Sequence, residues 1–159
     1  MQGLKNTEVY LAHYFGSNQQ VIKDTAKVDA NGQFVFQGNE ALDQGLYLVS
    51  FLTNKYFDIV IGNSQFSFES DTSDIIGQMR IQNSPENEAF YSFQRDMTAS
   101  YMAMQSKVKP EQIRSEMAVI QKKWIKDHAN LFVSKLIQAS IEPEIPAYSK
   151  PLKNAKDSA

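Results

Sequence analysis

The sequence predicts an α+β chain, with an antiparallel β-sandwich or barrel-like part at residues 1–83, a helical unit at 84–141 and a tail at 142–159. Two observations support this division. Up to about residue 70, short segments rich in aromatic and β-branched residues alternate with turn residues, as in antiparallel sandwiches and barrels. After residue 84, apolar residues recur at spacings of three and four, which is the period of a helix.

The most distinctive local pattern is a β-hairpin predicted over residues 21–36. Apolar and polar residues alternate on both sides of residues 29–32 (DANG), as expected of strands 21–28 and 33–36. Asp29 at the first position and Gly32 at the fourth favour a type I turn that ends with glycine at positive φ. The alternation places Asp24 on the same face as Ile22, Ala26 and Val28. We expect its carboxylate to bond a neighbouring hydroxyl or backbone amide.

The remaining strands are predicted from composition and from the turns between them. They lie at 8–15, 46–52, 56–61 and 65–69, with a weaker last strand at 78–82. Turns are expected at 16–18 (GSN), 53–55 (TNK) and 62–64 (GNS). The segment 46–52 alternates little, which favours a strand covered on both faces.

The helical unit is predicted as a hairpin of two helices followed by a shorter third helix. Ser84 is suited to cap the first helix, with Pro85 at its first position and acidic residues in its first turn. Its apolar face consists of Phe90, Phe93, Met97, Tyr101 and Met104. The second helix follows Lys109-Pro110, and its apolar residues are Ile113, Met117, Ile120, Trp124 and Ile125. Asn130 is expected to cap the third helix, which spans 131 to about 140.

Composition limits the classes of function. The net charge of −2 gives no indication of nucleic-acid binding, and no apolar run has the ~20 residues of a membrane span. The absence of cysteine excludes disulfides, thiolate metal sites and a catalytic thiol within these residues. Strand-like sequence begins soon after Met1, and the proline-containing tail suggests a following domain. We therefore expect this chain to be a piece of a larger precursor.

No catalytic, cofactor-binding or metal-binding residue is predicted. His13 and His128 have no partner at ligand spacing, so we interpret them as a sheet-face residue and a residue near a helix C-terminus. Paired carboxylates at Glu69, Asp71 and Asp74 would suit a glycoside hydrolase or a hard cation, but the sequence Asp-Thr-Ser-Asp is typical of a turn. Residues 29–32 lack the further ligands of an EF-hand loop.

Aromatic residues provide the one alternative site. They are Tyr10, Tyr14, Tyr47, Tyr56 and Trp124. If exposed, they would form a stacking platform for glycans or a surface for peptides. Their spacing on strands and helices more often indicates core positions.

Several segments resemble an uncharacterised domain family. They are 9–12 (VYLA), 23–26 (KDTA), 29–36 (DANGQFVF), 45–49 (GLYLV), 56–57 (YF), 66–72 (FSFESDT), 83–87 (NSPEN) and 142–146 (EPEIP). This family lies N-terminal to thioredoxin-like domains of the alkyl-hydroperoxide-reductase/thiol-specific-antioxidant (AhpC/TSA) type in exported Bacteroidetes proteins.

The resemblance implies a β-sandwich module of the periplasm or of a lipoprotein anchored in the cell envelope. It implies no catalytic residues, because the thiol–disulfide interchange of the parent proteins belongs to a Cys-x-x-Cys domain. We therefore expect a non-enzymatic accessory module for targeting, positioning or self-association. Its expected partners are a C-terminal thioredoxin-like domain of the same chain and a second copy bound through the helical unit, without nucleic acid, membrane insertion or cofactor. A ligand-binding sandwich is the alternative.

Overall fold

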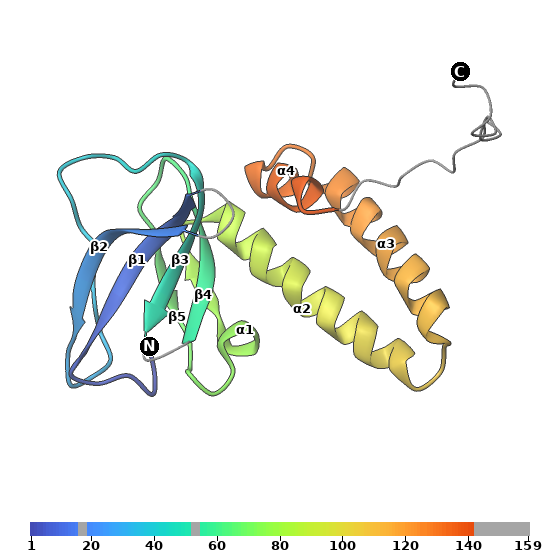
Figure 1. The fold of residues 1–159 in the computed structure, drawn as a ribbon, viewed down its shortest axis with the longest axis horizontal. Helices are drawn as coiled ribbons and strands as arrows, with labels where there is room; N and C mark the ends of the chain where they lie inside the picture. The colour runs from blue at the N-terminus through green and yellow to red at the C-terminus, as the bar shows by residue number, and fades with distance from the viewer. Residues whose placement is uncertain (16–18, 52–54, 142–159) are drawn as a thin grey trace, which may run out of the picture.

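The computed structural model describes residues 1–15, 19–51 and 55–141 and has the predicted α+β fold (Figure 1). One antiparallel sheet has the strand order β2-β1-β3-β4, formed by β1 (Thr7–Phe15), β2 (Gln19–Val28), β3 (Gly45–Phe51) and β4 (Lys55–Ile61). A second antiparallel sheet pairs β5 (Ser67–Glu69) with β6 (Arg80–Gln82). The helices are α1 (Ile75–Gln78), α2 (Pro85–Gln105), α3 (Pro110–Asp127) and α4 (Phe132–Ala139). The predicted turn at 16–18, part of the one at 53–55 and the tail at 142–159 lie outside the described residues.

The two sheets share one hydrophobic core. Its fully or nearly buried residues on the large sheet include Val9, Leu11, Ala26, Val28, Val49, Phe51, Phe57 and Ile59. Phe68 of β5 packs against this cluster, and its ring centroid lies 5.3 Å from that of Phe57 on β4. Edge-to-face contacts of this kind add to the free energy gained from apolar burial. The predicted sandwich arrangement therefore arises from aromatic contacts between a four-stranded and a two-stranded sheet.

The predicted turn at 29–32 is confirmed, whereas the second strand of the predicted hairpin is wrong. Gly32 N donates to Asp29 O at 3.2 Å, as in a hydrogen-bonded type I turn, and Gly32 has the expected positive φ, at +80°. The segment 33–36 forms no strand, because Phe34 and Phe36 turn their rings toward the core and pack edge-to-face at 5.5 Å. Next to this segment, the backbone N–H of Gln37 donates to the Asp24 side chain of β2, at 3.1 Å from Oδ2, and not to the backbone of β2.

Asp24 is a structural acid, as expected. Its carboxylate accepts the backbone N–H of Thr25 at 2.7 Å as well as that of Gln37. The alternation of β2 holds from Asp24 to Val28 but not on the N-terminal side of Asp24. A bulge shifts the register so that Leu11 is opposite Asp24 and Ala12 is opposite Ile22, which leaves Ile22 59% exposed.

The N-terminal segment crosses the hairpin turn. The terminal ammonium donates to Gly32 O at 2.9 Å, and Gln2 forms a parallel bridge with Asp71 in the segment after β5. A Cβ atom on Gly32 would lie 2.3 Å from Met1 O. Glycine is therefore required here both for its positive φ and for the close approach of the backbone.

The helices follow the prediction in order and type, with one addition. Ser84 caps α2, because its hydroxyl oxygen accepts the backbone N–H of Asn87 at 3.3 Å. Helices α2 and α3 form a hairpin, and α4 contacts both of them. The short helix α1 was not predicted; it begins where Asp74 accepts Gly77 N at 3.0 Å. Within the described part of the chain, no helix combines the length and apolar character needed to cross a membrane.

Candidate functional site

Helix α2 is attached to the free edge of the large sheet through the side chain of Asn87. This residue is fully buried, and its amide accepts Val60 N at 2.8 Å and donates to Val60 O at 2.7 Å. Because β4 is an edge strand, these two backbone groups of Val60 have no neighbouring strand to pair with. The Asn87 side chain therefore takes the place of the next strand. A third hydrogen bond, from Asn87 Nδ2 to Ser84 Oγ at 2.8 Å, fixes its orientation.

Tyr91 makes the second contact along the same edge. Its hydroxyl donates to Asp58 O at 2.7 Å, two residues before Val60. Four residues of helix rise by about 6 Å and two residues of strand by about 6.6 Å, so the pair Asn87/Tyr91 matches the pair Val60/Asp58. We call these four residues the edge clamp.

Two titratable groups of the edge clamp have shifted pKa values. Burial raises the pKa of the Asp58 carboxyl above its usual value. Burial also raises the pKa of the Tyr91 hydroxyl strongly, and the nearby charge of Asp58 raises it further. Both shifts favour the protonated forms, so the Tyr91 hydroxyl remains a hydrogen-bond donor throughout the ordinary pH range.

The first turn of α2 also holds α4. The Glu86 carboxylate accepts Phe132 N at 3.0 Å and Val133 N at 2.7 Å, which are free amides at the N-terminus of α4. The prediction that Asn130 caps this helix is wrong, because Leu131 occupies the cap position and makes no side-chain cap bond. A carboxylate at a helix N-terminus is also favoured by the helix dipole. Glu86 thus fixes the last helix to the same turn that docks on β4.

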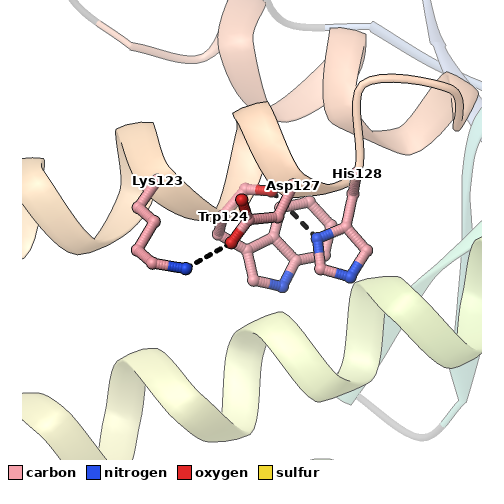
Figure 2. A network of polar contacts seen from close by, with 4 residues as sticks. All are labelled: Lys123, Trp124, Asp127 and His128. Atoms are coloured by element: carbon pink, nitrogen blue, oxygen red, sulfur yellow. Dashed lines mark hydrogen bonds and ion pairs between the residues drawn. The ribbon is translucent and has the colours of Figure 1, made fainter.

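The end of α3 carries a cluster of polar and aromatic side chains (Figure 2). The His128 ring stacks on Trp124 with centroids 4.1 Å apart, and its Nδ1 donates to Trp124 O at 2.9 Å. Lys123 pairs with Asp127 one turn along, and that hydrogen bond lowers the pKa of the Asp127 carboxyl. His128 lies at the C-terminus of α3 as predicted, and Trp124 packs on Phe93 of α2 at 4.8 Å. The cluster joins the end of α3 to α2 through the contact between Trp124 and Phe93.

Asp71 and Asp74, which follow β5, bond the local backbone, as their turn chemistry suggested. Asp71 accepts the backbone N–H and the hydroxyl of Ser73, which lowers the pKa of its carboxyl. Asp74 caps α1, and Glu69 is opposite Arg80 in the β5–β6 pair. Among the residues that the structure describes, no three His, Cys, Asp or Glu side chains are placed to hold a metal ion together.

The tyrosines predicted as a possible platform separate into two groups. Tyr47 is buried, and its ring centroid lies 5.7 Å from that of His13 in an edge-to-face arrangement. The side chain of Tyr14 lies outside the described part. Tyr10 and Tyr56, in contrast, lie on one row of the sheet, because Ser50 of β3 is opposite both of them. Directly opposite residues share a face, and two strand spacings separate the tyrosines by about 10 Å.

This row is partly open to solvent: Tyr10 and Ser50 are half-buried, and Tyr56 is exposed. Tyr56 is 54% exposed, and Ser50 presents only a hydroxyl between the two rings. The Tyr10 hydroxyl donates to Glu8 at 3.0 Å, which raises the pKa of that hydroxyl and adds a carboxylate beside the row. The arrangement has the aromatic faces and hydrogen-bonding groups that a planar polar ligand requires.

Sequence reasoning missed two residues that join α2 to the sheet and one that joins α2 to α4. Glu86, Asn87 and Tyr91 were visible only as parts of a helix start and its first turns. An amide or a carboxylate just inside a helix N-terminus gives no sign of a contact 27 or 46 residues away along the chain.

Comparison with known proteins places this architecture in a family. The model of a domain of unknown function, DUF4369, matches residues 1–90. No curated protein and no solved structure matches the chain. The matched region is more than half of the sequence and contains both sheets together with Asp58, Val60 and Asn87 of the edge clamp; Tyr91 is the first residue beyond it. The chain belongs to the DUF4369 family of domains of unknown function.

Proposed function

We propose that this chain is the non-catalytic module of an exported thiol–disulfide oxidoreductase, and that it positions or targets a thioredoxin-like domain following it in the same polypeptide. The proposal includes a periplasmic or lipoprotein-anchored location. Its sequence support is the resemblance to modules that precede AhpC/TSA-type domains. The chain contains no cysteine, so the redox chemistry would belong entirely to the following domain.

One structural observation carries the positioning role. The helical unit is attached to the sheet by the edge clamp, and its last helix is attached to the same turn by Glu86. Val133 and Ile137 of α4 also pack with Val60 of β4 in a second apolar cluster. A domain connected after α4 would therefore start from a fixed point relative to the sheet.

The natural reading frame beyond Ala159 tests the parent assignment. We expect a Cys-x-x-Cys motif within about 150 residues, which is a typical domain length. The purified chain itself should leave insulin disulfides unreduced, while the natural polypeptide should reduce them. An unrelated continuation, or reduction by the isolated chain, would contradict the proposal.

A second candidate function is the recognition of glycans or peptides on the row formed by Tyr10, Ser50 and Tyr56. It is favoured by the exposure of Tyr56 and by the shared face of the two tyrosines. A glycan array and a peptide panel would test it, with Tyr56→Ala expected to abolish any saturable binding. Binding that survives Tyr56→Ala would remove this candidate.

A further inference from the structure

The row formed by Tyr10, Ser50 and Tyr56, which we call the tyrosine row, lies on the face of the large sheet to which α4 is attached. Side chains alternate along a strand, so Val60 shares a face with Tyr56, four residues earlier on β4. Val60 in turn belongs to the apolar cluster that contains Ile137 of α4. Helix α4 therefore docks at the end of β4 on the face that carries the row.

The residues that follow α4 contain most of the prolines of the chain. Of the five prolines, Pro85 and Pro110 start α2 and α3, where a helix tolerates them. The other three lie within residues 143–151, which are outside the described residues and contribute only their sequence. Pro143 and Pro146 form the pattern Pro-x-x-Pro, which favours the polyproline II conformation, a common ligand of aromatic-lined grooves.

The spacing of the tyrosine row matches this pattern. Polyproline II has three residues per turn and rises by about 3.1 Å per residue, so residues three apart share a side and lie about 9 Å apart. Tyr10 and Tyr56 are separated by two strand spacings, about 10 Å, with Ser50 between them. Two prolines three residues apart can therefore each contact one tyrosine ring. The backbone carbonyls of this conformation have no internal hydrogen bonds, so the hydroxyls of Ser50 and Tyr56 are suitable donors for them.

We propose that the tyrosine row binds Pro143 and Pro146 of the same chain, with Pro143 on Tyr56 and Pro146 on Tyr10. The direction follows from the place of α4, because β4 is the strand on which α4 docks and β1 lies two strands further. Four residues lead from the end of α4 to Pro143 and span up to about 14 Å when extended. The contact of α4 with β4 lies four residues from Tyr56 along the strand, about 13 Å. The segment is therefore long enough to reach the row.

This inference rests on the second candidate function, since it names a proline-containing segment of the chain itself as the peptide that the row binds. It also deepens the positioning role. The chain would leave the sheet only after Pro146, so fewer free residues would separate a following domain from the sheet.

A spin label at Ala147→Cys tests the contact in the whole chain, which has no other cysteine. The amide NMR signals of Tyr10 and Ser50 should broaden more than those of β5 and β6, which pack on the opposite face of the sheet. Tyr56→Ala should remove this difference. Tyr101→Ala is the matched control and should leave it unchanged, because Tyr101 is a similarly exposed tyrosine outside the row. It is 47% exposed on α2, although the helical periodicity predicted it on the apolar face.

A second variant changes the segment and leaves the sheet intact. Substituting Pro143→Ser together with Pro146→Ser should also abolish the broadening, because serine favours polyproline II less and has no ring to contact a tyrosine. Broadening that is equal on both faces of the sheet, or that survives either set of substitutions, overturns the inference.

Mixing copies separates this contact from one between chains. Spin-labelled chain without isotope, mixed with isotope-labelled chain without the spin label, should show no broadening. Broadening in this mixture assigns the contact to a second copy and overturns the assignment to the same chain. A row that binds panel peptides while the label broadens nothing keeps the second candidate function and rejects this inference. None of these results depends on the reading frame, so a failed parent assignment is also distinguishable.

Discussion

The edge clamp makes the free energy of unfolding sensitive to the side chain of Asn87. In Asn87→Ala, both backbone groups of Val60 lose their partner, and Val60 is only 1% exposed, so water has little access. Each unsatisfied buried group costs about 1–3 kcal/mol. We therefore expect the free energy of unfolding to fall by about 3 kcal/mol, which is a large part of the ~5–15 kcal/mol of a typical domain.

Urea unfolding followed by circular dichroism measures this change, and the melting temperature should fall by roughly 6–12 °C. Glu88→Ala is the control in the same turn, because Glu88 is exposed and its substitution should change the free energy of unfolding by less than about 0.5 kcal/mol. Asn87→Asp should be as harmful as Asn87→Ala, since a carboxylate cannot donate to Val60 O. A loss below 1 kcal/mol in both Asn87 variants would refute the reasoning.

Three further predictions concern the other contacts of this region and the hairpin turn. Glu86→Ala should cost about 1–2 kcal/mol and should accelerate amide hydrogen exchange in α4 more than in α2, because two α4 amides lose their acceptor; equal acceleration in both helices would contradict this. Gly32→Ala should destabilise the chain by about 1–3 kcal/mol in urea unfolding, because φ is +80° and Met1 O is close, whereas Gly62→Ala, with nothing within 4 Å, should not. Since burial raises the pKa of Asp58, the folded state holds its proton to higher pH than the unfolded state, so stability should fall as pH rises through the interval from 3.8 up to that raised pKa. Asp58→Asn should flatten that part of the pH–stability curve, and an unchanged curve would exclude Asp58 as its cause.

The features that were predicted best from the sequence are those determined by neighbouring residues, namely a helix start and a turn. Ser84 and Pro85 start α2 at the predicted residue, and the Asp29–Gly32 turn forms with the predicted positive φ. In each case the residues that determine the structure lie within four positions of one another. Backbone geometry and capping act over that distance, so their signals are readable without the rest of the fold.

Features decided by distant contacts were missed or wrong. Residues 33–36 have the alternation of a strand. The side chains of Phe34 and Phe36 pack against the hydrophobic core, however, and the segment forms no strand. Asn130 is a good cap residue, yet Glu86 from another helix satisfies the α4 amides. The row of Tyr10 and Tyr56 depends on the register of both strands with β3, which the sequence does not specify.

The distance between the sheet and the end of α4 tests the positioning role most directly. Spin labels at Lys27→Cys and Gln138→Cys, both exposed sites, would report it by pulsed electron resonance in protein diluted with unlabelled chain. We predict one narrow distance distribution, which should broaden when Glu86→Ala is added because α4 then loses its anchor. A broad distribution in the chain with Glu86 intact would contradict the positioning role.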